Sequence, residues 1–277
     1  MLADAREMNA VADRIMATID DRSRAILEAV DRRYDEAEMN RLAAMMDEVL
    51  NGVPVQYATG WTDFRGLRVM CGPEALIPRP ETEELVDWFV AGVETGIAQG
   101  PSNPAPERVR VLDVGTGSGC IALAIKALRP EWEVFGLDIS EGALELAQRN
   151  AAALELEVHW IRADALDQDR TGWPAPLNGI VSNPPYIPQS ESGLMAGHVT
   201  RHEPGIALFV PDDDPLLFYR SLWGAALELL PSGGCLAAEC HHALTRDVAK
   251  CWQLEVGESE VLSDLQGAER AVRLNRP

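Results

Sequence analysis

The chain has 277 residues, which is long for one compact domain, so we expect a small accessory domain beside a larger one. Asp and Glu number 44 against 24 Lys and Arg, for a formal net charge of −20, which argues against a protein that needs clustered basic side chains to bind nucleic-acid phosphates. No uncharged apolar run approaches the ~20 residues of a membrane span, and the first residues carry no signal peptide, so neither a membrane protein nor a secreted one is expected.

The N-terminal quarter of the chain differs from the rest. Residues 6 to about 50 are charged and rich in alanine, with apolar residues at helical spacing, and predict two to four short helices. Residues 51–75 alternate with Gly and Pro and predict a hairpin that joins this part to the next. We therefore expect an N-terminal helical domain over residues 1–75 and a larger domain over residues 76–277.

A glycine-rich loop follows the first strong apolar strand of the larger part. Residues 109–114 (V-R-V-L-D-V) predict a buried strand, residues 115–119 (G-T-G-S-G) form the loop, and a helix is expected to start at Cys120. Glycine permits positive φ and lets a ligand approach the backbone closely. The dinucleotide fingerprint G-x-G-x-x-G would need glycine at Cys120, and no Walker lysine follows, so phosphoryl transfer is not expected.

The next strand of the larger part ends in a carboxylate. Residues 134–137 (V-F-G-L) predict this strand, and Asp138 follows it, where it can accept hydrogen bonds from both hydroxyls of a ribose. Ligands of doubly wound sheets lie beyond the carboxyl ends of the strands. Because strands and helices alternate through the rest of the chain, the sequence predicts a doubly wound, Rossmann-like α/β sheet.

A third element, N-P-P-Y, follows the apolar run at residues 179–182 (G-I-V-S). Pro184 and Pro185 end the predicted strand because proline cannot donate to a sheet ladder. The Asn183 amide offers an acceptor and two donors at a fixed place, and Tyr186 supplies a flat face. This arrangement suits binding of a planar group that carries N–H bonds, such as an amide or an exocyclic amine. A strand-ending turn with a core tyrosine is the structural alternative.

The glycine loop, Asp138 and N-P-P-Y, in this order, resemble the class I methyltransferases that use S-adenosylmethionine. N-P-P-Y narrows the resemblance to enzymes that methylate planar nitrogens, either glutamine amides or adenine amino groups. The run I-P-R-P-E-T-E at residues 77–83 is similar to the release factor glutamine methyltransferases and separates them from the ribosomal-protein glutamine methyltransferases. Other matching stretches lie at residues 52–60, 64–67, 201–204, 233–239 and 268–272.

The resemblance implies transfer of a methyl group from S-adenosylmethionine to the glutamine side-chain amide in the Gly-Gly-Gln motif of peptide chain release factors. The implied cofactor contacts are Gly115, Thr116, Gly117, Ser118, Gly119, Asp138, Asp164 and Asn183. The implied catalytic residues are Asn183, Pro184 and Tyr186, and the implied substrate contacts are Asn183, Pro184, Pro185 and Tyr186. In this scheme the Asn183 side-chain oxygen and the Pro184 carbonyl accept the two amide N–H bonds, and no histidine acts as a base.

Two departures from the family pattern stand out. Ala165 follows Asp164 where some members carry tryptophan, so an aromatic adenine contact is either missing or supplied elsewhere. His241 stands where members commonly have glycine, two residues after Glu239.

Other functions stay open from the sequence. The chain could methylate glutamine in another translation protein, or an adenine amino group of nucleic acid, although the acidity speaks against nucleic acid. A non-catalytic cofactor-binding adaptor is disfavoured by the intact Asn183 and glycine loop. The negative charge suits a basic protein partner, or serves solubility alone. We expect a cytoplasmic monomer that contacts neither nucleic acid nor membrane.

The cysteines predict free thiols and no metal site. The five cysteines show no paired spacing, as in a cytosolic protein. Cys235, Cys240, His241 and His242 invite a metal reading, but Cys235 opens the predicted strand and the other three lie beyond its far end.

Overall fold

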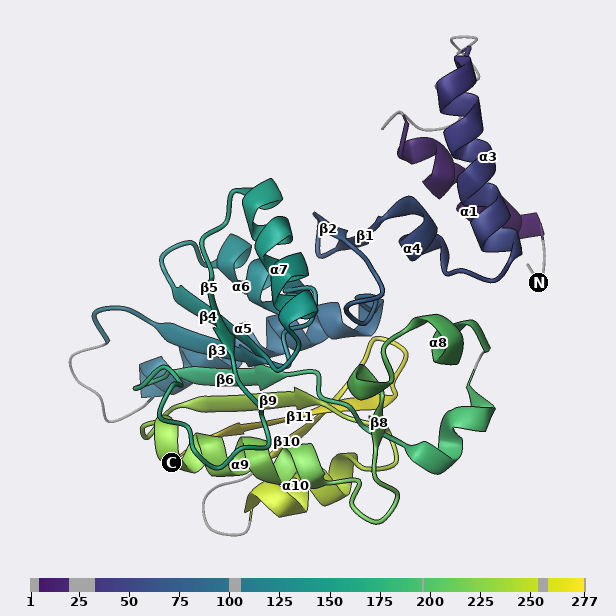
Figure 1. Ribbon diagram of the computed structural model, residues 1–277. Coiled ribbons are helices and arrows are strands. Elements are labelled where there is room, and N and C mark those ends of the chain that lie inside the picture. The colour runs from purple at the N-terminus through teal and green to yellow at the C-terminus, as the bar shows by residue number, and fades with distance from the viewer. Residues whose placement is uncertain (1–4, 20–32, 100–105, 196, 254–258, 277) are drawn as a thin grey trace.

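The computed structural model describes residues 5–19, 33–99, 106–195, 197–253 and 259–276 (Figure 1). Part of the predicted N-terminal helical region, residues 20–32, lies outside these ranges. In the described part a small helical region precedes a larger α/β region, and Figure 1 shows the first helices standing away from the sheet. No helix of the described residues is long and apolar enough to span a bilayer.

The helical region contains α1 (Ala5–Ala17), α3 (Glu36–Leu50) and α4 (Val55–Thr59). A capping box starts α3: the Asp35 side chain accepts from Glu38 N, and the Glu38 side chain accepts from Asp35 N. Of the predicted hairpin region, residues 51–75, the first part contains α4, and the hairpin itself is confirmed as β1 (Trp61–Phe64) paired antiparallel with β2 (Leu67–Met70). Arg65 and Gly66 both have positive φ, as a two-residue hairpin turn requires.

The larger region is built on a seven-stranded sheet of order β10-β11-β9-β6-β3-β4-β5. Its strands are β3 (Arg110–Val114), β4 (Glu133–Asp138), β5 (His159–Arg162), β6 (Gly179–Ser182), β9 (Cys235–Glu239), β10 (Glu260–Ser263) and β11 (Glu269–Asn275). Strands β5, β4, β3, β6 and β9 are parallel neighbours, and β11 runs antiparallel to β9 and β10. The chain order reverses between β3 and β6, so their carboxyl ends flank a switch point where doubly wound sheets bind ligands.

Helices cover both faces of this sheet (Figure 1). One core packs α5 (Pro80–Gln99), α6 (Cys120–Leu128) and α7 (Glu141–Leu154) on one face. A second core packs α9 (Leu217–Leu229) and α10 (Thr245–Gln253) on the other. Because both faces are covered, β6 is buried along its whole length, which explains its continuous apolar run. The predicted doubly wound fold is confirmed.

An insertion between β6 and α9 lies at the carboxyl end of the sheet. It contains β7 (Ile187–Pro188), η1 (Gln189–Leu194), α8 (Gly197–His202), η2 (Gly205–Ala207) and β8 (Phe209–Val210). The buried Glu203 fastens it to the segment before α5, because its carboxylate accepts from Arg79 Nη2 at 2.6 Å and from Ile77 N at 3.1 Å. The insertion and that segment therefore form facing walls above the sheet edge.

Candidate active site

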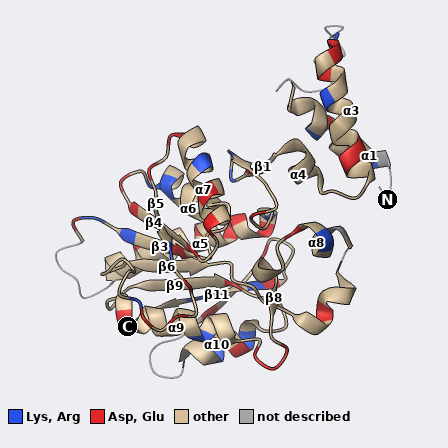
Figure 2. Cartoon of the chain, viewed as in Figure 1, with Lys and Arg blue, Asp and Glu red and all other residues tan. Residues whose placement is uncertain are grey.

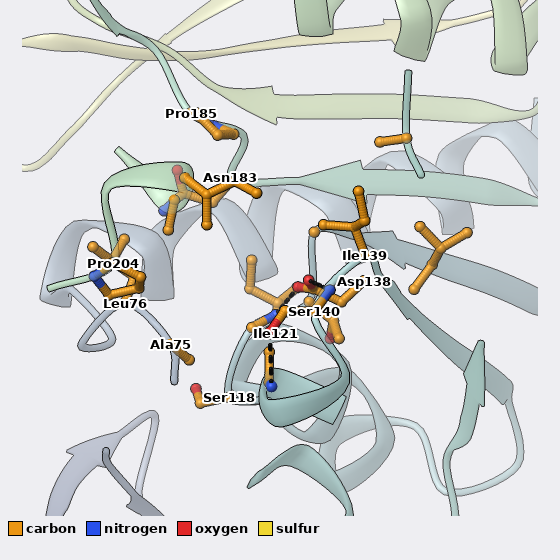
Figure 3. A pocket seen from close by; sticks show the side chains of 18 of the residues that line it. Ala75, Leu76, Ser118, Ile121, Asp138, Ile139, Ser140, Asn183, Pro185 and Pro204 are labelled. Carbon is orange, nitrogen blue, oxygen red and sulfur yellow. Dashed lines mark hydrogen bonds between the residues drawn. The ribbon is translucent and has the colours of Figure 1, made fainter. Parts of the chain in front are cut away.

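A cavity of about 280 Å³ lies at the carboxyl ends of the central strands. Its walls come from the segment before α5, the loops after β3, β4, β5 and β6, and the insertion. In Figure 3, Asn183, Pro204 and Leu76 lie toward one end and Asp138, Ile139 and Ser140 toward the other. The predicted site residues that line it are Gly115, Thr116, Gly117, Ser118, Asp138, Asp164, Asn183 and Pro185. Gly119, Pro184 and Tyr186 lie outside the lining.

Backbone hydrogen bonds and positive-φ glycines fix the glycine loop at the wall of this cavity. Gly115 N and Thr116 N both donate to the Leu137 carbonyl, at 2.8 and 2.9 Å. Gly115 and Gly117 have φ of 70° and 55°, which other residues rarely adopt. A Cβ at Gly115 would meet no atom within 4 Å, and one at Gly117 would meet Ala75 at 3.7 Å. The two glycines thus leave free space beside the loop that side chains would fill.

Gly119 has a different position from the other loop glycines. It caps the start of α6 with φ of 81°. A Cβ there would come within 2.8 Å of the Trp160 ring and 3.0 Å of Ala147. Gly119 therefore lets α6, α7 and β5 pack closely behind the loop.

Asp138 joins the end of β4 to the glycine loop. Its Oδ2 accepts from Gly117 N and its Oδ1 from Ser140 N, each at 2.9 Å. Burial raises the pKa of this carboxyl, and the two backbone hydrogen bonds oppose that effect. A carboxylate oxygen can accept more than one hydrogen bond, so Asp138 keeps acceptor capacity at the cavity wall.

Asp113 supports the loop from beneath. It is fully buried, and its Oδ2 accepts from Thr116 Oγ1 at 2.6 Å and from Ala122 N at 3.2 Å. Its Oδ1 has no hydrogen-bond partner among the described residues. Burial, with a smaller contribution from the Asp138 charge, raises the pKa of Asp113 from 3.8 to about 7. Below pH 7 the folded protein therefore favours the protonated form of Asp113.

This raised pKa makes stability depend on pH. A carboxyl that binds its proton more tightly when folded adds stability below pH 4, and that stability is lost as pH rises through the folded-state pKa. In Asp113→Asn, the amide oxygen can keep both hydrogen bonds and its NH₂ replaces the unpartnered oxygen. From pH 4 to pH 7 we expect the wild type to lose up to about 4 kcal/mol relative to Asp113→Asn in urea unfolding. Parallel stability curves would contradict this assignment.

Asn183 offers an acceptor to the cavity. Its Nδ2 donates to Thr82 Oγ1 at 3.2 Å. Among the described residues, none donates to Asn183 Oδ1 or to the Pro184 carbonyl. The turn after β6 therefore carries two oxygen atoms, on adjacent residues, that can accept hydrogen bonds from a ligand.

Tyr186 turns toward the end of β9. Its hydroxyl donates to Glu239 Oε1 at 3.2 Å, and its ring centre lies 6.3 Å from that of His241. Burial, followed by the Glu239 charge, raises the pKa of Tyr186, so the phenol remains a donor. His241, which stands where family members commonly have glycine, thus lies beside the N-P-P-Y turn.

Some residues that line the cavity were not predicted as site residues from the sequence. Phe218, at the start of α9, lines the same cavity as Ile139, Ala165 and Leu166. It supplies an aromatic side chain in the cavity whose lining includes Ala165. Thr82, from the family-like run at residues 77–83, also lines the cavity.

The cysteine and histidine residues considered for a metal do not converge. Cys235 begins β9, and Cys240 follows its other end. The His241 and His242 rings lie 4.3 Å apart, centre to centre. In the described ranges, no three His, Cys, Asp or Glu side chains are arranged to hold a metal ion.

Comparison with known proteins finds a methyltransferase family model and similar sequences that are release factor glutamine methyltransferases. Residues 102–200 match the family model described as "Methyltransferase small domain". A release factor glutamine methyltransferase of Bacteroides thetaiotaomicron is 38% identical over 224 residues, covering 80% of this chain and 76% of the relative. One of Deinococcus radiodurans is 37% identical over 224 residues, covering 81% of this chain and 75% of the relative.

A solved structure shows the same fold. The hMettl16 catalytic domain, in complex with MAT2A 3'UTR hairpin 6, superposes with a TM-score of 0.57 at 14% identity. The match covers 87% of this chain and 82% of that structure. The chain has the class I methyltransferase fold.

Proposed function

The chain belongs to the release factor glutamine methyltransferases, and from that membership we propose that it methylates the side-chain amide nitrogen of glutamine in the Gly-Gly-Gln motif of peptide chain release factors. The methyl donor in this proposal is S-adenosylmethionine. The observation that carries the proposal is the acceptor Oδ1 of Asn183, a residue of the cavity lining on the turn after β6, with the Pro184 carbonyl next to it in the chain.

The cavity chemistry fits S-adenosylmethionine. Gly115 and Gly117 leave space for an extended ligand beside the loop backbone, and Asp138 has acceptor capacity for ribose hydroxyls. Ile139, Ala165, Leu166 and Phe218 offer apolar surface to a purine ring, with the exposed Asp164 at the edge. Bound there, S-adenosylmethionine supplies an electrophilic methyl group on a sulfonium.

The acceptor pair suits a primary amide substrate. An amide nitrogen is a poor nucleophile because its lone pair is delocalised into the carbonyl. Asn183 Oδ1 and the Pro184 carbonyl would accept its two N–H bonds, fixing the nitrogen in place and favouring the positive charge that develops on it. No base is needed before attack, because the nitrogen becomes acidic once it is methylated and then releases its proton.

The charge of the chain suits a basic protein surface better than nucleic acid. Figure 2 shows Lys and Arg scattered over separate elements with Asp and Glu among them. The formal net charge is −20. Binding of nucleic acid requires neutralisation of phosphates, whereas a negative field attracts a basic partner.

The helical region, residues 1–75 in our division, is proposed to dock the protein substrate. Arg14 on α1 connects it to the hairpin: Nη1 donates to the Trp61 carbonyl at 2.9 Å, and the guanidinium lies 4.9 Å from the Trp61 ring centre. Arg68 contacts the same ring at 4.1 Å. This contact holds α1 against the hairpin that leads into the catalytic region.

If the helical region docks the substrate, loosening this contact weakens substrate capture without changing chemistry. Arg14→Ala is expected to raise KM for release factor about fivefold while kcat stays within twofold of wild type. The matched control is Arg41→Ala, which removes an exposed positive charge from α3. Steady-state kinetics with purified release factor measures both constants. Equal increases in KM for the two variants would mean that charge, not the contact, matters.

The test of the proposed function locates the methyl group. The purified chain is incubated with methyl-labelled S-adenosylmethionine and unmethylated release factor, with adenine-containing DNA in a parallel reaction. Mass spectrometry should place the label on the Gly-Gly-Gln glutamine and on no release factor whose glutamine is replaced by alanine. Label on DNA, or none on release factor despite cofactor binding, would overturn the proposal.

A further inference from the structure

Behind Asn183 lies a chain of hydrogen bonds, one buried and two partly buried, that the proposed reaction does not by itself require. Thr82, in the first turn of α5, and Glu239, at the end of β9, are 2% and 4% exposed. Thr82 Oγ1 donates to Glu239 Oε2 at 2.6 Å and accepts from Asn183 Nδ2 at 3.2 Å. These contacts join three elements that are far apart in sequence.

The direction of these hydrogen bonds follows from proton counting. Burial raises the pKa of Glu239, and the hydrogen bonds from Thr82 and Tyr186 oppose that rise by stabilising the ionised form. A threonine hydroxyl has one proton, and Glu239 in its ionised form only accepts. Tyr186 occupies the other carboxylate oxygen as a donor, so both partners of Glu239 give it their protons. Thr82, having donated to Glu239, can only accept from Asn183. The Asn183 atom that faces Thr82 must therefore be the NH₂ group.

We propose that Thr82 and Glu239 are positioning residues that set the orientation of the Asn183 amide, so that its oxygen faces the substrate. This inference rests on the proposed function, because the orientation matters only for a substrate that donates N–H bonds. A flipped amide would present its own N–H bonds to the substrate amide and remove one of the two acceptors. The backbone of Glu239, at the end of β9, is also fixed, because Tyr219 Oη donates to the Glu239 backbone carbonyl at 3.1 Å.

Three variants separate orientation from packing. Thr82→Val keeps the volume and removes the hydroxyl, and is expected to lower kcat at least tenfold. Thr82→Ser keeps the hydroxyl, and should remain within about threefold of wild type. Glu239→Gln retains the shape but can donate to Thr82, which then turns its proton toward Asn183. That reversal should lower kcat as Thr82→Val does, and it tests the proposal through a second position if one variant folds poorly.

A double-mutant cycle tests whether Thr82 acts through Asn183. In the Asn183→Ala background, Thr82→Val should change the residual rate less than twofold. Equal effects of Thr82→Val in the two backgrounds would overturn the proposal, as would full activity of Thr82→Val in the wild-type background. S-adenosylmethionine affinity, measured by calorimetry, verifies that the variants retain the cofactor site.

A readout without substrate distinguishes this proposal from the proposed function. In ¹H–¹⁵N spectra, the Asn183 side-chain signals are identified by their loss in Asn183→Ala. We expect them to shift in Thr82→Val and Glu239→Gln and to stay near their wild-type positions in Thr82→Ser. Unchanged signals in Thr82→Val would overturn the orientation role. If the wild type does not methylate release factor but these shifts are present, the proposed substrate is wrong and the orientation role of Thr82 and Glu239 stands.

Discussion

Replacement of Asn183 with alanine is expected to lower kcat for release factor methylation by a hundredfold to a thousandfold, the usual effect of removing one hydrogen-bonding group aimed at developing charge. The variant loses the side-chain acceptor at the cavity wall, whereas the Pro184 carbonyl remains. One N–H bond of the substrate amide is then unpaired, and the nitrogen is less well aligned. Single-turnover transfer of labelled methyl groups measures the rate.

Asn178→Ala is the matched control for this loss. Asn178 lies just before β6, at the opposite end of the strand from Asn183, where its Oδ1 accepts from Arg110 N at 2.9 Å. This variant should melt at a lower temperature but retain kcat within about threefold, because it removes a hydrogen bond far from the cavity. If both variants lose activity equally, general destabilisation explains the loss and Asn183 has no direct role.

Local sequence patterns were enough to predict the sheet and to predict that the glycine loop, Asp138 and N-P-P-Y lie together at one edge of it. The apolar runs at residues 109–114, 134–137 and 179–182 predicted buried strands, and the structure confirms each of them. Parallel strands carry their following loops to one edge, so a motif after β3 and a motif after β6 had to lie together once β3 and β6 were neighbours.

Contacts between distant side chains could not be predicted in this way. Thr82 and Glu239 are 157 positions apart, and their hydrogen bond depends on how α5 packs against β9. Phe218 lies in the first turn of α9, and only the packing of that helix brings this turn to the cavity. The run at residues 77–83 was recognisable, yet the ion pair of Arg79 with Glu203 needed the insertion to be placed first.

Loss of the Asp138 carboxylate is expected to weaken S-adenosylmethionine binding about a hundredfold, because hydrogen bonds to a charged group contribute roughly 1.5–3 kcal/mol each. Asp138→Ala removes the acceptors proposed for the ribose. It also leaves Gly117 N and Ser140 N without their partner, so the glycine loop loses its fixed shape. Isothermal titration with S-adenosylmethionine measures the affinity directly, independent of any protein substrate.

Two further variants show which of these effects dominates. Glu145→Ala removes a negative charge from the exposed side of α7 and should bind S-adenosylmethionine as the wild type does. Asp138→Asn keeps one acceptor oxygen and replaces the other with an NH₂ donor. The side chain can then no longer accept from the backbone N–H groups of the loop and from a ribose hydroxyl at the same time. We therefore expect Asp138→Asn to bind almost as weakly as Asp138→Ala. Wild-type affinity in Asp138→Asn would mean that Asp138 shapes the loop through one hydrogen bond and does not bind the ribose.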